Sequence, residues 1–72
     1  MPDWVDPCRR TIGERVRTIR RAARLSQVQL GERVGRDHKT IHRWETAATD
    51  PTLTDLLLLA DALNVPLAEL VQ

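Results

Sequence analysis

The 72-residue sequence has no tyrosine or phenylalanine, a single cysteine, three glycines and no long apolar run. Its longest unbroken apolar stretch, residues 56–60, is far shorter than the roughly 20 residues that a membrane span needs. Cys8 can form no internal disulfide and cannot hold a metal ion alone. Asn-Gly turns and alternating apolar and polar residues are also missing, which argues against β-strands. These absences predict a small cytoplasmic helical domain without a membrane segment, metal site or cofactor.

Basic residues are absent after position 43, although the net charge of the whole chain is only +1. All eleven Lys and Arg lie in residues 9–43, where only three acidic residues accompany them. Residues 44–72 hold five acidic residues, and residues 1–8 hold two more. This distribution indicates a face that binds a polyanion and an acidic face behind it. Arginines that only solvate helix surfaces would give the same count, so charge alone leaves both interpretations open.

Apolar residues recur at helical spacing from position 12 onward. The first helix is expected over residues 11–24, beginning at a capping box formed by Thr11 and Glu14. Its inward face carries Ile12, Val16, Ile19 and Ala23. Residues 1–8 are then an N-terminal arm, and one helical domain covers residues 9–72.

Two short helices are expected next. A capping box of Ser26 and Gln29 predicts a helix over residues 27–34, and Gly35 suits the left-handed residue that ends it. Asp37 can cap a further helix over residues 38–46. Two short helices joined by a tight turn that contains glycine are typical of a helix-turn-helix.

The helix over residues 38–46 has two chemically different faces. Ile41 and Trp44 share one side, which we expect to face the core. The opposite side carries side chains that donate hydrogen bonds: Lys39, His42, Arg43 and Thr46. Lys and Arg can donate to the O6 and N7 atoms of guanine, so this face suits the edges of bases.

The last part of the chain predicts two more helices. A capping box of Thr52 and Asp55 begins a helix over residues 53–63. Its core residues are expected to be Leu53, Leu56, Leu57, Ala60 and Leu63, with Leu59 at the margin and Leu58 facing outward. Asn64 suits the C-cap, and Pro66 can begin a short fifth helix over residues 67–71.

Residues 12–70 resemble the Cro and phage-repressor type of helix-turn-helix domain, the XRE family. The resemblance rests on collinear motifs: Leu25-Ser26-Gln27, Leu30, Gly35, Ile41, Arg43-Trp44-Glu45, Pro51-Thr52-Leu53, Leu56-Leu57, Leu59-Ala60-Asp61-Ala62-Leu63 and Val65-Pro66-Leu67. It implies an all-α, compact five-helix lambda-repressor-like bundle whose second and third helices read DNA. The implied function is sequence-specific binding of double-stranded DNA by a bacterial or phage transcription regulator, more often a repressor than an activator.

The resemblance also implies roles for individual residues. In the major groove, the base contacts would be made by His38, Lys39, His42 and Arg43. Phosphates would be bound by Ser26, Gln27, Thr40, Thr46 and Arg20. An ion pair between the first and third helices would join Arg20 and Glu45. A homodimer on DNA would gain apolar contacts from Leu58, Val65 and Pro66.

The sequence also departs from the family pattern in places. Residues 46–49 read Thr-Ala-Ala-Thr, where relatives often have glycine followed by basic or polar residues. Alanine is strained in a left-handed cap, so we expect this turn to take another shape. Gly31 stands where the family usually has alanine, which costs up to about 1 kcal/mol of helix propensity.

Other functions keep some support from the residues. The protein could be an antitoxin whose acidic C-terminal half holds a toxin, or a helix-turn-helix shell that binds another protein instead of DNA. His38 and His42 have the spacing to chelate a metal on one helix face, but no third ligand is near. We expect no enzyme activity, because no Ser-His-Asp set, glycine-rich phosphate loop or metal cluster is present.

Overall fold

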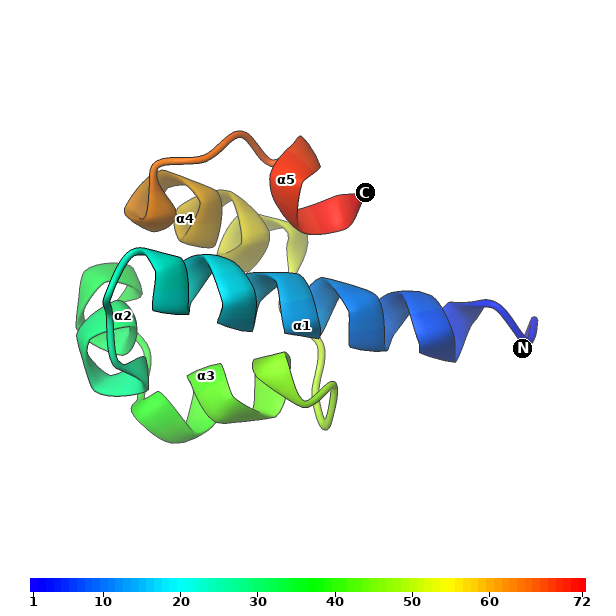
Figure 1. Cartoon of the computed structure of the whole chain (residues 1–72). Helices are drawn as coiled ribbons and strands as arrows, with labels where there is room; N and C mark the ends of the chain where they lie inside the picture. The colour runs from blue at the N-terminus through cyan, green and yellow to red at the C-terminus, as the bar shows by residue number, and fades with distance from the viewer.

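The structure is a computed structural model that describes residues 1–72, and it contains five helices and no strand. The helices are α1 (Val5–Ala22), α2 (Gln27–Val34), α3 (His38–Glu45), α4 (Leu53–Leu63) and α5 (Ala68–Val71). α1 runs through the middle of the molecule, with α4 and α5 on one side and α3 on the other (Figure 1). None of the helices combines the length and apolar character that crossing a membrane requires. The expected all-α five-helix fold class is confirmed.

The beginnings of three helices are fixed by side chains close in sequence. Ser26 and Gln29 form the expected capping box of α2, each side chain accepting a hydrogen bond from the backbone N–H of the other. Asp37 caps α3 by accepting from the backbone N–H of Lys39. Thr52 and Asp55 form the capping box of α4. The predicted starts of α2, α3 and α4 are therefore confirmed.

The predicted start of α1 is wrong. The helix begins at Val5 instead of residue 11, so it includes residues 5–8 of the segment expected to be an arm. Thr11 lies inside the helix and donates its hydroxyl hydrogen to the carbonyl oxygen of Pro7 at 2.9 Å, so it caps nothing. Pro7 does not break the helix, because the backbone nitrogens of the first turn have no acceptor within a helix. Ala23, expected inward, lies just past the end of the helix and is exposed.

Each of the first four helices is followed, within two residues of its end, by a residue with left-handed backbone geometry. These residues are Arg24, Gly35, Ala47 and Asn64, with φ angles of 60°, 70°, 60° and 56°. Gly35 and Asn64 were expected in this role. The expectation that the turn at Ala47 takes another shape is wrong, because the alanine adopts the left-handed conformation. A residue with a Cβ atom pays about 1–2 kcal/mol for this geometry, so Arg24 and Ala47 are strained.

One apolar core joins all five helices. Its fully enclosed members include Val16, Leu30, Ile41, Leu59 and Leu70, which come from α1, α2, α3, α4 and α5 respectively. Complete burial of a side chain of this kind contributes about 1.5–3 kcal/mol. Because each helix supplies at least one buried side chain, the position of every helix depends on the others.

α4 is rotated relative to the prediction. Leu53 and Leu57 are 65% and 50% exposed, and Leu59, expected at the margin, is fully buried. Asp55 lies on the inward side instead, and its carboxylate accepts from the backbone N–H of Thr52 at 3.0 Å and from Arg36 at 2.8 Å. Burial alone would raise the pKa of Asp55, but these hydrogen bonds outweigh it and lower the pKa below its usual value.

Gly31 lies where two backbone segments touch. A Cβ atom at this position would overlap the carbonyl oxygen of Arg36, and the N–H of Arg36 donates to the carbonyl of Gly31 at 2.8 Å. The sequence indicated only a loss of helix propensity here. The structure shows that glycine is required, because the chain folds back on this residue as it leaves α2.

We therefore expect Gly31→Ala to destabilise the protein by about 1–3 kcal/mol, although alanine is the better helix former. Urea unfolding followed by circular dichroism measures the difference. Glu32→Ala, an exposed neighbour on the same helix, is the matched control and should change the stability by less than about 0.5 kcal/mol. A Gly31→Ala protein that is more stable than the wild type would show that the turn relaxes to make room for the Cβ atom and that helix propensity determines the change in stability.

Candidate nucleic-acid interface

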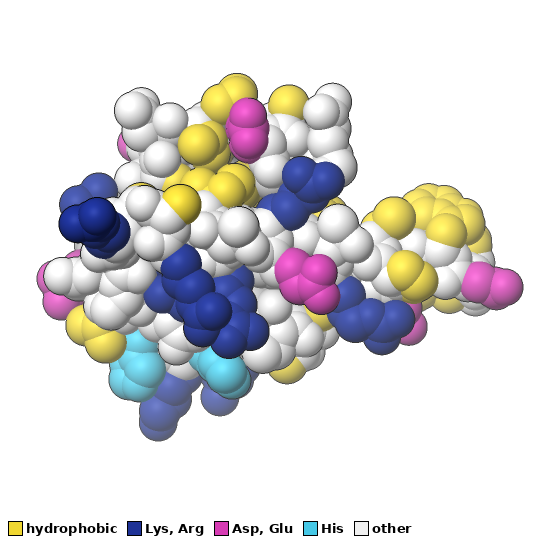
Figure 2. Space-filling model, viewed as in Figure 1, with side chains coloured by type: hydrophobic (Ala, Val, Ile, Leu, Met, Phe, Trp, Pro, Cys, Tyr) yellow, Lys and Arg dark blue, Asp and Glu magenta, His cyan; other side chains and the backbone are white.

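α3 is anchored on one side and open on the other. Ile41 and Trp44 are buried in the core, as expected. The outward side presents the side chains expected to contact bases, all of them exposed: His38, Lys39, His42 and Arg43. The two histidines lie beside a cluster of Arg and Lys side chains on one face of the molecule (Figure 2). The structure thus brings the expected base-contacting residues together on one surface.

A buried ion pair links α1 to α3. The Nε atom of Arg20 lies 2.6 Å from Oε2 of Glu45, and Nη2 lies 3.0 Å from Oε1, so the contact is bidentate. The third nitrogen, Nη1, donates to the carbonyl oxygen of Leu25 at 2.8 Å. The two side chains are only 9% and 2% exposed. The pair expected between Arg20 and Glu45 is present, and it fills the crossing of the two helices.

The crossing is close because α1 carries a glycine there. A Cβ atom on Gly13 would lie 2.6 Å from the carbonyl oxygen of Trp44 and 2.7 Å from that of Glu45. Any larger residue would push the end of α3 away from α1. Gly13 therefore sets the distance at which Arg20 reaches Glu45.

Gln27 extends this network to the surface. Its Nε2 atom lies 3.2 Å from Oε1 of Glu45 and 3.3 Å from Nδ1 of His42. The carboxylate can only accept, so the amide nitrogen of Gln27 must face it. The same nitrogen then donates to Nδ1 of His42, which places the proton of a neutral His42 on Nε2. Both amide hydrogens of Gln27 are engaged in this way, and its phosphate contact stays a prediction.

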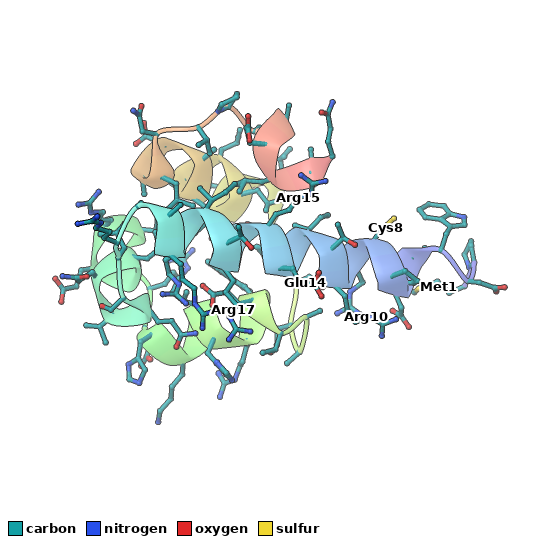
Figure 3. All side chains as sticks on the ribbon, in the orientation of Figure 1. Met1, Cys8, Arg10, Glu14, Arg15 and Arg17 are labelled. Atoms are coloured by element: carbon teal, nitrogen blue, oxygen red, sulfur yellow. The ribbon has the colours of Figure 1, made fainter.

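Two arginines that the sequence did not single out border the same place. A recess of about 80 Å³ is lined by Arg17, Arg20, Arg21, Gln27, His42, Glu45 and Thr46. Arg17 extends from α1 on the side of α3 (Figure 3). Arg17 and Arg21 are exposed and, unlike Arg20, form no ion pair. In the sequence, Arg17 and Arg21 lie three residues before and one residue after Arg20. This spacing becomes informative only when it is known where α1 crosses α3.

Of the other expected phosphate ligands, Arg20 and Thr46 line this recess, whereas Ser26 and Thr40 do not. Ser26 is exposed, but its hydroxyl oxygen accepts from the backbone of Gln29. Thr46 donates its hydroxyl hydrogen to the carbonyl of His42 at 3.0 Å, and Thr40 is half-buried. Arg20 is buried with Nε, Nη1 and Nη2 all bonded within the protein, so the ion pair is its visible role. Phosphate binding by each of these residues remains a prediction.

The helix-turn-helix domain family matches residues 11–72 of the sequence. The chain belongs to this family. The restriction-modification controller protein C.AhdI from Aeromonas hydrophila is similar in structure, with a TM-score of 0.82 and 33% identity, over 85% of this chain and 92% of that one. The c2 repressor of phage P22, solved in complex with a synthetic operator, has a TM-score of 0.79 and 34% identity at the same coverage.

Repressor protein C2 of Salmonella phage P22 is also similar in sequence, with 38% identity over 53 residues. The matched part is 74% of this chain but 24% of the phage protein, so the chain spans about a quarter of that relative's length. The helix-turn-helix match begins at residue 11. The first turns of α1 therefore precede the residues that the family shares.

Glu45→Ala is expected to destabilise the helix-turn-helix domain by about 3–5 kcal/mol, because it leaves the buried guanidinium of Arg20 without its charged partner. Glu45→Gln keeps the shape of the side chain, and its stability should lie between that of Glu45→Ala and that of the wild type. Urea unfolding at low temperature measures both. Asp50→Ala, which removes an exposed partner of Arg9, is the matched control and should cost less than about 1 kcal/mol. Unchanged stability of Glu45→Ala would contradict a structural role for the pair.

Proposed function

We propose that this helix-turn-helix protein binds double-stranded DNA sequence-specifically with α3 in the major groove and acts as a transcription regulator, in the first instance a repressor at the nucleoid in the cytoplasm. The observation that carries the proposal is the outward face of α3, where Lys39 and Arg43 project over a buried anchor. The major groove of B-DNA admits an α-helix, and Lys or Arg donate there to guanine. The similar P22 repressor was solved in complex with an operator, which supports this use of the fold.

The surface around α3 suits the DNA backbone. Arg17 and Arg21 lie across the recess from His42, at the side where a strand flanking the groove would pass. Cations at this place neutralise phosphates without reading sequence, and they fix the angle at which α3 enters the groove. We therefore add Arg17 and Arg21 to the predicted phosphate contacts: Arg20, Ser26, Gln27, Thr40 and Thr46. His38 and His42 complete the base-reading set with Lys39 and Arg43.

Selection from a random duplex library at about 100 mM salt tests the proposal. Salt at this concentration weakens the non-specific attraction to phosphates, so the contacts to bases decide which duplexes are enriched. Wild-type protein should enrich a motif, and Lys39→Ala/Arg43→Ala should lose it. Arg17→Ala and Arg21→Ala should keep the motif, bind more weakly, and each reduce the salt slope of log K by about 1.

Arg33→Ala is the matched control, since Arg33 bonds the carbonyl of Ala62 on α4, away from the outward face of α3. It should leave the motif and the salt slope unchanged. No enrichment by wild-type protein would contradict DNA recognition and favour a protein partner, such as the toxin of a toxin–antitoxin pair.

We also propose that the protein binds DNA as a homodimer through α4 and α5. Leu53 and Leu57 lie exposed on α4, and a recess of about 290 Å³ further along is lined by Ala60, Asp61, Asn64, Val65 and Pro66. Leu57, Asp61 and Asn64 follow at helical spacing, so Leu57 lies on the face that leads to Val65 and Pro66. Leu58, the residue expected here, is 41% exposed but lies about one quarter-turn away around the helix.

Leu57→Glu should weaken dimerisation at least about tenfold, because it places a charge in the apolar contact. Sedimentation velocity over a concentration series measures the change, and Leu58→Glu is the matched control with the smaller expected effect. The reverse ranking would favour the contact set of Leu58, Val65 and Pro66. A wild-type protein that is monomeric at high micromolar concentration and binds a single half-site would contradict the dimer.

A further inference from the structure

Arg9 connects the first turns of α1 to the loop that follows α3. Its Nε atom lies 2.7 Å from Oδ1 of Asp50, and Nη2 donates to the backbone carbonyl of Ala47 at 2.9 Å. Nη1 lies 3.0 Å from Oδ1 of Asp6, one turn earlier on α1. The side chains of Arg9 and Asp50 are 33% and 62% exposed, so the charge attraction alone is screened by water. The bond to the backbone of Ala47 is the directional contact.

The loop over residues 46–50 contains no glycine and still makes a left-handed turn at Ala47. This turn lets the N–H of Ala48 donate to the carbonyl of Arg43 at 2.9 Å, and the N–H of Ala47 donate to Trp44 at 3.2 Å. The bond from Ala48 requires the left-handed residue before it, which the Cβ atom of alanine disfavours. Arg9 is the side chain from another helix that hydrogen-bonds this loop, so the strained turn is held from outside.

The left-handed turn at Ala47 also holds the last residues of α3. The carbonyl of Arg43 accepts from the N–H groups of Ala48 and Thr49, at 2.9 and 3.3 Å. If the turn opens, the carbonyl of Arg43 loses these partners and the end of the helix frays. Arg43 is one of the proposed base-contacting residues, so opening of the loop would change the position of a residue in the proposed DNA interface.

We propose that Arg9 is a positioning residue of the DNA interface, which holds the left-handed turn at Ala47 and so fixes the end of α3 that carries Arg43. The proposal rests on the DNA-binding function above and extends it to a residue that precedes the matched family region. Arg9 acts through the loop and touches no base. A direct phosphate contact is the competing explanation, and the two differ in their salt dependence.

The test is the affinity of Arg9 variants for the selected DNA motif, measured as a function of salt and well below the unfolding temperature. Arg9→Ala should bind roughly fivefold to tenfold more weakly with an unchanged salt slope, because no phosphate contact is lost. Arg9→Lys should be similarly weak, since an ammonium group cannot span Ala47 and Asp50 with the geometry of the guanidinium. Wild-type affinity in Arg9→Ala or Arg9→Lys, or a slope lower by about 1, would overturn the proposal.

A second substitution in the loop makes the test sharper. Ala47→Gly removes the penalty of the left-handed turn, so Arg9→Ala/Ala47→Gly should recover most of the lost affinity. Arg24→Gly removes the same penalty at the end of α1 and is the matched control. In the Arg24→Gly background, the loss caused by Arg9→Ala should remain undiminished. Rescue by Arg24→Gly, or no rescue by Ala47→Gly, would contradict the coupling.

The loop can also be followed without DNA. Hydrogen exchange of the Ala48 amide should be at least about threefold faster in Arg9→Ala than in the wild type, because the turn opens more often. Unchanged exchange would overturn the positioning role whatever the protein binds. If exchange accelerates while wild-type protein enriches no DNA motif, the proposed function fails and the contact between Arg9 and the loop stands.

Discussion

A pair of opposite charges placed out of reach of water holds α3 against α1. Removing two charges from water costs several kcal/mol for each, and their attraction offsets this only when the geometry is good and the other polar atoms are bonded. Arg20 meets these conditions with two nitrogens on Glu45 and the third on the carbonyl of Leu25. Gln27 supplies a further donor to the carboxylate. Three helices therefore meet at one carboxylate, and a shift of any of them breaks a buried hydrogen bond.

α3 needs this constraint because it is only eight residues long. A helix of two turns is unstable alone, since the cost of nucleation is spread over few hydrogen bonds. Burial of Ile41 and Trp44 attaches α3 to the core, but apolar contacts are not directional and tolerate a small rotation. The bidentate contact of Glu45 is directional. It fixes which side chains of α3 point outward, and that orientation is what a reader of base edges requires.

Most features set by neighbours in sequence could be predicted, although the start of α1 could not, and among the distant contacts only the pair of Arg20 and Glu45 was expected, from the family resemblance. The boundaries of α2 and α4 follow from the capping boxes at Ser26 and Thr52, in which both partners lie within one turn. Helical periodicity in α4 placed Leu56, Ala60 and Leu63 on the core side correctly and Leu53 and Leu57 wrongly. It gave no sign that Asp55 would lie inside and meet Arg36 of the preceding loop. In the same way, the helical periodicity of residues 38–45 predicts the outward face of α3. Arg17 and Arg21 lie beside this face only because α1 crosses α3 at Gly13.

The placement of glycine shows how the remaining strain is distributed. Gly13 and Gly31 stand where two backbone segments touch and a Cβ atom has no room, so no other amino acid fits at these positions. At the ends of α1 and α3, where glycine would relieve the left-handed turn, the chain has Arg24 and Ala47 instead. A strained turn persists only where its surroundings over-determine it. At Ala47 those surroundings include the side chain of Arg9 from the first turns of α1, so the segment ahead of the matched helix-turn-helix region is bonded to the loop that ends α3.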